Sequence, residues 1–144
     1  MTEPTRIDEI AARFWEDYLE LAPTTATVYG DTRYDDRLDD PGPAGRAAAR
    51  ALAERVGREA AEVPPEGLSV EDRITRDMLG IVADLAIEGD DLAFRELSTL
   101  SHIDGAQTVL AQLAVFQAAD TPERLDSWLT RLRGYGPFLD ANME

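Results

Sequence analysis

The stretch DTPERLDSWLTRLRG, residues 120–134, carries the start and stop signals of a single helix. Thr121 suits the N-cap, where its hydroxyl accepts a backbone N–H, and Pro122 suits the first helical turn. Gly134 follows the last periodic residue and is expected to end the helix. Four apolar residues recur at helical spacing and are expected to face inward: Leu125, Trp128, Leu129 and Leu132. The stretch therefore predicts an amphipathic helix.

The same period extends outward over most of the chain. Gly30 and Gly89 are expected to end two of the helices, and Ser69 with Asp72 forms a capping box that opens another. The expected helices cover residues 7–22, 23–29, 43–62 and 70–88, a segment after Asp104 that carries Val109, Leu110, Leu113 and Phe116, and a start at Pro137. No strand pattern competes, so the sequence predicts an all-α fold, an irregular bundle of about five to seven helices.

The same periodicity gives apolar faces to the other helices: Ile7, Ile10, Ala11, Phe14, Trp15, Tyr18 and Leu19 in the first, and Ala48, Leu52, Val56 and Ala60 in the helix over 43–62. In the helix after Ser69, one face is expected to carry Ile74, Met78, Ile81, Val82 and Leu85. Trp15 and Trp128 lie on the apolar stripes of their helices, and packing in the core is the expected role of both.

Composition excludes several classes of function. The net charge is -15, which argues against binding to nucleic acid or to an anionic membrane. All 14 basic residues are arginine, so a Schiff-base lysine and a Walker-type phosphate loop are excluded. Cysteine is absent, which removes disulfides, thiolate metal sites and a cysteine nucleophile. The first ten residues lack the pattern of a signal peptide, and no apolar run is long enough to span a membrane, so we expect a cytoplasmic protein.

The stretch TTATVYGDTRYDDRLDD, residues 24–40, concentrates aspartate, arginine and tyrosine around Gly30. It fails as a calcium loop: counting from Asp31, the sixth position holds Asp36 instead of glycine, and the twelfth holds Gly42 instead of glutamate. Three interpretations stay open. The aspartates form a solvated turn that caps its own backbone, the arginines hold another segment, or the carboxylates bind a metal directly.

Within this stretch we expect Arg33 and Tyr34 to point back toward the helical body, while Asp39 and Asp40 remain solvated. The chain must turn at Gly30, which places the arginine and the aromatic ring beside the turn. The candidates for a cleft or a contact between segments are Asp31, Arg33, Tyr34, Asp35, Asp36 and Arg37.

The residue types of a hydrolase triad occur in STLSHIDG, residues 98–105: Ser98, Ser101, His102 and Asp104. A triad depends on geometry between separately held side chains, and the side chains of sequence neighbours usually diverge, so a structural or exposed histidine is favoured. His102 is the only histidine, so these residues contain no two-histidine zinc motif. We expect no catalytic residue and no metal ligand in the chain.

Three segments resemble a known family. RFWEDYLELAPTTATVYGDTRYDDRLDD, residues 13–40, resembles the start of a large bacterial family called domain of unknown function 885, whose members share a Gly-Asp-x-Arg-Tyr-Asp-Asp-Arg-Leu run. LSVEDRITRDML, residues 68–79, is similar to the family's Leu-Ser-x-Glu-Asp-Arg segment. WLTRLRGYGPFLD, residues 128–140, is similar to its Leu-x-Arg-Leu-Arg helix but departs from it at GYGPF, which puts the helix expected from Pro137 in doubt.

The resemblance implies a function for the intact protein and not for this chain. Full-length relatives are several times longer and similar to helical zinc metallopeptidases, with a His-Glu metal motif far downstream. The resemblance therefore implies that the chain is an N-terminal, non-catalytic portion of such a protein, forming a wall or cover of a cleft for a peptide substrate. Zinc is implied for the full-length protein and no cofactor for residues 1–144, which form one all-α domain or fragment.

The last residues raise the question of partners. The apolar pattern that starts at Pro137 stops after barely two turns, which suggests a piece of a longer protein. The missing C-terminal region would then cover an apolar surface. Its candidate residues are Phe138, Leu139 and Met143, with Leu97 and Leu100 of the connection before them. The alternative is a free-standing acidic helical module that self-associates.

Overall fold

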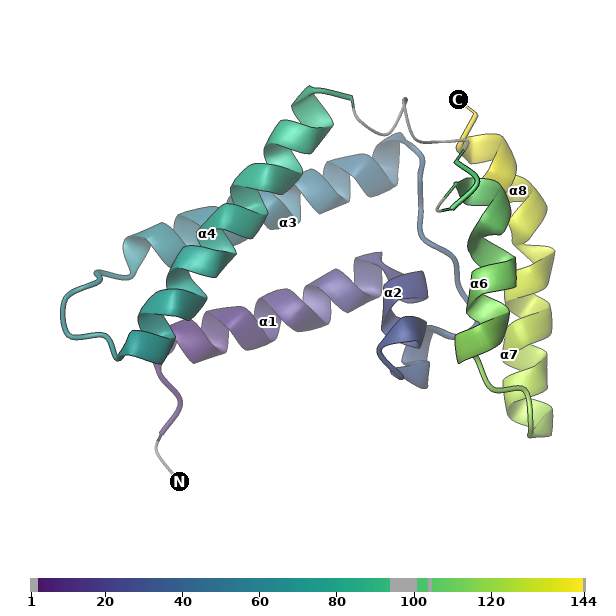
Figure 1. The fold of residues 1–144 in the computed structure, drawn as a ribbon, viewed down its shortest axis with the longest axis horizontal. Coiled ribbons are helices and arrows are strands. Elements are labelled where there is room, and N and C mark those ends of the chain that lie inside the picture. The colour runs from purple at the N-terminus through teal and green to yellow at the C-terminus, as the bar shows by residue number, and fades with distance from the viewer. Residues whose placement is uncertain (1–2, 94–100, 104, 144) are drawn as a thin grey trace. The chain divides into compact units, whose positions relative to one another are not determined.

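The computed structural model describes residues 3–93, 101–103 and 105–143, and these residues contain helices and no strand. The all-α prediction is confirmed. The helices form two compact units (Figure 1). The first unit contains residues 3–18 and Ala47–Ala93, and the second contains Leu19–Arg46 with the described residues from 101 onward.

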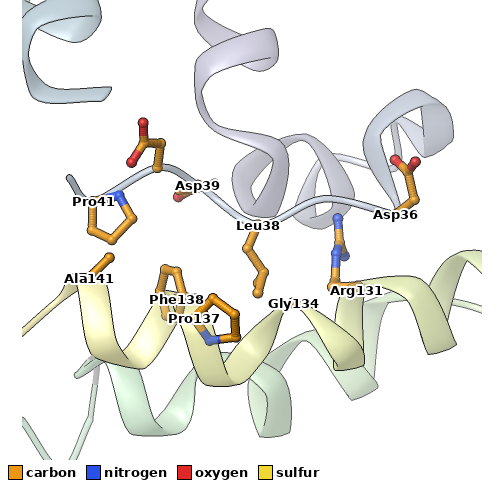
Figure 2. A pocket seen from close by; sticks show the side chains of 10 residues that line it. Asp36, Leu38, Asp39, Pro41, Arg131, Gly134, Pro137, Phe138 and Ala141 are labelled. Carbon is orange, nitrogen blue, oxygen red and sulfur yellow. The ribbon is translucent and has the colours of Figure 1, made fainter. Parts of the chain in front are cut away.

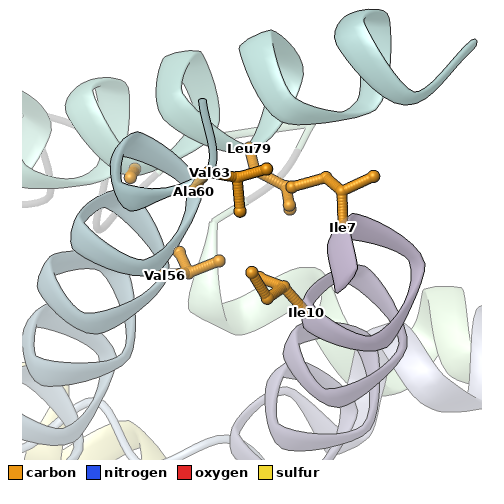
Figure 3. Close-up of a cluster of buried hydrophobic side chains, with 7 residues drawn as sticks. Ile7, Ile10, Val56, Ala60, Val63 and Leu79 are labelled. Atoms are coloured by element: carbon orange, nitrogen blue, oxygen red, sulfur yellow. The ribbon is translucent and has the colours of Figure 1, made fainter. Parts of the chain in front are cut away.

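The first unit consists of three long helices: α1 (Arg6–Leu21) up to Tyr18, α3 (Pro43–Glu62) from Ala47, and α4 (Val70–Asp91). Apolar side chains from all three converge on one core (Figure 3). Its buried members are Ile7, Ile10, Val56, Ala60, Val63, Leu79 and Ala83. The α3 bounds agree with the sequence prediction, and the core accounts for the apolar period of α1.

The α3 and α4 helices approach each other closely because the residues between them are small. A Cβ placed on Gly57 of α3 would lie 3.1 Å from the Cβ of Ala83 on α4. Arg50 of α3 adds hydrogen bonds of 2.8 Å to Asp90 and 2.7 Å to Asp91 at the surface. Exposed ion pairs of this kind contribute little, so burial of the small and apolar residues holds the unit together.

The start of α4 follows the sequence prediction and its end does not. The hydroxyl of Ser69 accepts a hydrogen bond of 3.0 Å from the backbone N–H of Asp72, as the capping box predicts. The prediction that Gly89 ends the helix is wrong, because α4 continues to Asp91. Gly89 does not form the left-handed stop that glycine favours, because among the described glycines only Gly30 and Gly67 have a positive φ.

The predicted inward faces of α1 and α3 are buried, including Ile10, Val56 and Ala60, but the predicted face of α4 and the core role of Trp15 are wrong. The five apolar residues assigned to one face of α4 are all exposed: Ile74, Met78, Ile81, Val82 and Leu85. The helix instead buries Leu79 and Ala83. Trp15 is 40% exposed and its ring stacks on that of Tyr18 at 5.9 Å, so it is not a core residue. The close approach of α3 and α4 selects the small face of α4 for burial.

The second unit begins with α2 (Pro23–Val28), which packs against α6 (Val109–Phe116), and a short 3-10 turn, η1 (Thr32–Tyr34). A second such turn, η2 (Ala106–Thr108), leads into α6. The remaining helices are α7 (Pro122–Arg133) and α8 (Tyr135–Ala141). The Tyr135 hydroxyl donates a hydrogen bond of 3.0 Å to the carbonyl of Ala106, which ties α8 to the start of the α6 segment.

Both ends of α7 are predicted correctly. The Thr121 hydroxyl accepts a hydrogen bond of 3.3 Å from the backbone N–H of Arg124, and the helix ends at Arg133 before Gly134. Gly134 keeps right-handed dihedral angles, with φ −74° and ψ −9°, so α8 follows almost directly (Figure 1). The last helix therefore starts two residues before Pro137, and the four residues YGPF that follow Gly134 are helical.

The predicted inward face of α7 is wrong. Leu125, Leu129 and Leu132 are exposed, and Trp128 is only half-buried. The residue that α7 buries is Arg131, whose side chain is fully enclosed. A charged residue replaces the leucines at the packed face because the surrounding segments supply polar atoms to it.

Candidate functional site

The acidic motif, residues 30–40, begins with a left-handed turn at Gly30, whose φ is +84°. Asp31 then caps η1, and one of its carboxylate oxygens accepts a hydrogen bond of 3.0 Å from the backbone N–H of Arg33. The Arg33 guanidinium also donates a bond of 2.6 Å to Asp31. These bonds hold the pKa of Asp31 below its ordinary value of 3.8.

This geometry corrects the expectation for Arg33. Its side chain is 53% exposed and pairs with Asp31 beside it, so it does not point back toward the helical body. Tyr34 is half-buried, with the guanidinium carbons of Arg33 and Arg37 lying 5.3 and 5.2 Å from its ring centroid. The structure thus brings Asp31, Arg33, Tyr34 and Arg37 together in a surface cluster, in which cation–π contacts contribute.

Asp35 is the motif carboxylate that is buried, with 5% of its surface exposed. It accepts a hydrogen bond of 2.7 Å from the hydroxyl of Thr27 on α2. Its own carbonyl accepts a bond of 2.8 Å from the side-chain amide of Gln117 at the end of α6. Two elements of the second unit therefore hold this one residue.

Arg131 holds the backbone of the same motif. Its Nε donates a hydrogen bond of 2.6 Å to the carbonyl of Arg37, and its Nη2 donates one of 2.7 Å to the carbonyl of Tyr34. Nη1 donates a bond of 2.7 Å to the side-chain oxygen of Gln117, and Nη2 one of 2.9 Å to the hydroxyl of Thr27. A single side chain on α7 thus binds η1, the segment after it, α2 and the end of α6.

The partners of Arg131 explain how a guanidinium is tolerated in this position. Burial lowers its pKa, and the nearby charges of Asp35, Asp39 and Asp36 oppose that shift. The group stays charged, because an arginine guanidinium is not deprotonated in proteins. Within the described residues, every buried side-chain nitrogen and oxygen has a hydrogen-bond partner. Full satisfaction of this kind makes a buried polar network rigid.

A shallow cleft of about 300 Å³ lies beside the motif (Figure 2). Its apolar lining comes from the motif segment and α8: Leu38, Pro41, Pro137, Phe138 and Ala141. Three carboxylates of the motif also line it: Asp36, Asp39 and Asp40. Asp39 is fixed there by Thr24, whose backbone N–H and hydroxyl donate bonds of 3.0 and 2.8 Å. Asp39 is therefore less solvated than the sequence suggests, whereas Asp40 is exposed as expected.

The family model described as "Bacterial protein of unknown function (DUF885)" matches residues 23–144. The chain belongs to this family. The match starts at the first residue of α2 and includes the whole acidic motif, α7 and the cleft, whereas all of α1 precedes it. No curated protein matches the chain.

The other candidates in this DUF885 chain lie apart from the motif or at its edge. Phe138 is half-buried and lines the cleft, Leu139 is half-buried, and Met143 is exposed on the last described turn. Leu97 and Leu100, the other residues assigned to an interface, lie outside the described residues.

The triad residue types do not assemble into a described site. His102 is exposed, and the Ser101 hydroxyl accepts a bond of 3.3 Å from the backbone N–H of Ile103. Ser98 and Asp104 lie outside the described residues. No group of three histidine, cysteine or acidic residues suited to a metal ion occurs in residues 3–93, 101–103 and 105–143. In the same ranges, no helix is both long and apolar enough to cross a membrane.

Sequence reasoning missed Arg131 and Gln117, which hold the DUF885 motif in place. In the sequence, Arg131 is one of several charged residues on a leucine-rich helix. The signal that pointed to it was the Leu-x-Arg-Leu-Arg pattern, because Arg131 is the first arginine of that pattern. Gln117 carries no comparable signal. The arrangement that results is an open cleft with an acidic rim, and among the described residues that line it there is no nucleophile paired with a base.

Proposed function

We propose that this DUF885 chain is a non-catalytic part of a metallopeptidase-like protein, where it forms a wall or cover of the cleft that receives a peptide substrate. The observation that carries the proposal is the set of hydrogen bonds by which Arg131 holds the acidic motif. Its bonds to the carbonyls of Arg37 and Tyr34 fix the backbone from which the rim carboxylates project. A surface fixed before the ligand arrives loses less conformational entropy when it binds.

The cleft itself suits part of an extended peptide. Leu38, Pro137 and Phe138 offer apolar contact, and Asp36 and Asp39 offer carboxylate oxygens at the edge. Backbone N–H groups and basic side chains of a peptide are donors for such oxygens. The open form of the cleft fits a wall and not an enclosed reaction site.

The zinc that the family resemblance implies does not fit the residues of this chain. A catalytic zinc takes three protein ligands from histidine, carboxylate and cysteine side chains, and the peptidases that use it draw on at least two histidines. The chain has a single histidine and no cysteine. The proposal therefore assigns metal binding and bond cleavage to residues other than these, and it derives no chemical step from them.

The sequence of the complete gene distinguishes this proposal from a second candidate, a self-associating helical module. A reading frame that continues past Glu144 to a His-Glu metal motif supports the cleft wall, and a stop codon there counts against it. In the complete gene product, Asp36→Asn should raise KM for peptides with basic residues and leave kcat unchanged. The control is Asp126→Asn, an exposed aspartate of α7. An unchanged KM in Asp36→Asn would overturn the assigned role of the rim.

The second candidate is an acidic helical module that self-associates. The exposed apolar residues along α4 favour it, because a contiguous apolar face is a common contact surface. Repulsion from the charge of -15 opposes association, and salt screens that repulsion within about 8 Å at physiological strength. Sedimentation velocity should then show a dimer that strengthens with salt. A monomer at every salt concentration would exclude this candidate.

A further inference from the structure

The exposed face of α4 forms an apolar stripe that the core of the first unit does not use. Its members are Ile74, Met78, Ile81 and Leu85, which are 58%, 51%, 51% and 62% exposed. They succeed one another at alternating four- and three-residue steps, the spacing of the seam along which two helices pack. The face that α4 turns to its own core carries Leu79 and Ala83 instead.

A hollow of about 240 Å³ opens at the edge of this stripe, between α3 and α4. It exists because the residues along that line have little or no side chain: Gly57, Ala60 and Ala61 of α3, and Gly80 of α4. A Cβ placed on Gly80 would meet no atom within 4 Å. Ile81 belongs to both the stripe and the hollow, so the two form one continuous surface.

The same hollow is lined by Asp77 and Asp84, two turns apart on α4. Arg76 also lines it, but its guanidinium is engaged with the carbonyl of Val63 at 2.7 Å and with Asp77 at 2.9 Å. Asp84 has no ion-pair partner among the described residues. From Asp77 to the end of α4 the helix contains no basic residue, so this edge of the stripe is negatively charged.

We infer that the α4 stripe and its hollow dock an amphipathic helix whose apolar seam is flanked by lysine or arginine. The seam covers Met78, Ile81 and Leu85. A flanking basic side chain lies with its aliphatic part in the hollow over Gly80 and Ala61, and its charge reaches Asp84. Long basic side chains commonly bury their stems in this way, and a helix laid on an apolar surface is a frequent mode of recognition.

Charge favours this occupant over a second copy of the chain. An antiparallel pairing of two α4 helices would set the edge with Asp77 and Asp84 against the same edge of the other copy. Each copy also carries a net charge of -15, which opposes association at low ionic strength. A basic helix meets neither obstacle. The surface belongs to the first unit and the motif cleft to the second, so the test of one does not decide the other.

The test uses two synthetic helical peptides of roughly 21 residues with the same leucine seam, one flanked by lysine and one by glutamate. Fluorescence anisotropy should show that the labelled lysine peptide binds the chain, that salt weakens it, and that the glutamate peptide does not bind. Ile81→Ser and Asp84→Asn should each weaken binding by roughly tenfold.

Two control variants separate docking from general attraction to an acidic protein. Val115→Ser removes an exposed apolar residue of α6, and Asp126→Asn removes an exposed charge of α7, so both should bind the lysine peptide as the unaltered chain does. Equal weakening in the controls and in the α4 variants would overturn the inference, and so would equal binding of both peptides. A dimer in sedimentation velocity that Ile81→Ser dissolves would assign the stripe to a second copy instead.

Discussion

Arg131 and Thr27, 104 residues apart in the chain, share a hydrogen bond of 2.9 Å in which the guanidinium Nη2 donates to the threonine Oγ1. The proton of that hydroxyl is directed to Asp35, 2.7 Å away. A neutral hydroxyl therefore stands between a buried cation and a buried carboxylate. The two charges stabilise each other through Thr27, and the acidic motif depends on a residue of α2 that lies outside it.

Replacing Arg131 should destabilise the second unit. Arg131→Met leaves the carbonyls of Arg37 and Tyr34 and the oxygen of Gln117 without their donor, and each buried unsatisfied acceptor costs about 1–3 kcal/mol. A urea melt should show a loss of at least about 3 kcal/mol. Arg133→Met, an exposed position in the same turn of α7, should lose less than about 1 kcal/mol. Equal losses would mean that the buried guanidinium does not hold the motif.

Removing only the hydroxyl of Thr27 should give an intermediate loss. Thr27→Val keeps the size of the side chain but takes away the acceptor for Arg131 and the donor for Asp35. We expect a loss of about 1–3 kcal/mol in thermal or urea unfolding. Thr25→Val on the same helix, at a position whose side chain makes no hydrogen bond to another described residue, should change stability by less than about 0.5 kcal/mol. An unchanged stability in Thr27→Val would show that the hydroxyl between Arg131 and Asp35 does not stabilise the fold.

The ion pair of Asp31 predicts a specific acid response. Its folded-state pKa lies below 3.8 because Arg33 donates hydrogen bonds to the carboxylate, so its stabilising contribution is complete above that pH. The contribution is lost as pH falls through the lowered pKa. Carbon-13 NMR of the carboxyl group should show this pKa rising toward 3.8 in Arg33→Gln. The pKa of Asp120, lowered mainly by Arg124, should not move in that variant and is the internal control.

Two glycine substitutions should have opposite signs. A Cβ on Gly45 would lie 2.0 Å from the backbone carbonyl oxygen of Asp40, so Gly45→Ala requires the end of the motif to shift and should cost about 1–3 kcal/mol. Gly80→Ala, in the interior of α4 with open space around it, should stabilise the chain by about 0.5–1 kcal/mol. Unfolding curves of the two variants measure both. An unchanged free energy of unfolding in Gly45→Ala would show that the backbone at Asp40 can shift at little cost.

Helix positions could be predicted from the sequence because their signals are local. The Thr121 cap, the Ser69 cap and the turn at Gly30 each depend on residues within a few positions, and the structure confirms all three. The end at Gly89 was wrong because a glycine permits a left-handed stop without requiring one. Periodicity, by contrast, shows that a helix has an apolar face and not which neighbour covers it.

That distinction explains the errors in the core. Ile81 and Leu129 lie on clear apolar stripes, yet both are exposed, because α4 packs through Ala83 and α7 packs through Arg131. A fully hydrogen-bonded arginine can occupy a packed face, and its acceptors come from segments about 100 residues earlier in the chain. A hydropathy pattern cannot predict these hydrogen-bond acceptors. The motif could be found by its composition, but the atoms that hold it could not.

The long reach of Arg131 also sets an order of events during synthesis. The carbonyl of Arg37 lies 94 residues before the guanidinium that binds it, and translation at roughly 5–20 residues per second separates the two by roughly 5–20 s. During that interval the acidic motif has been synthesised, but the arginine whose hydrogen bonds fix its backbone has not. We expect the motif's carboxylates to keep this early segment hydrated and to oppose aggregation until α7 has been made, because net charge favours solubility. The charge that borders the cleft in the folded chain would then also protect the nascent chain.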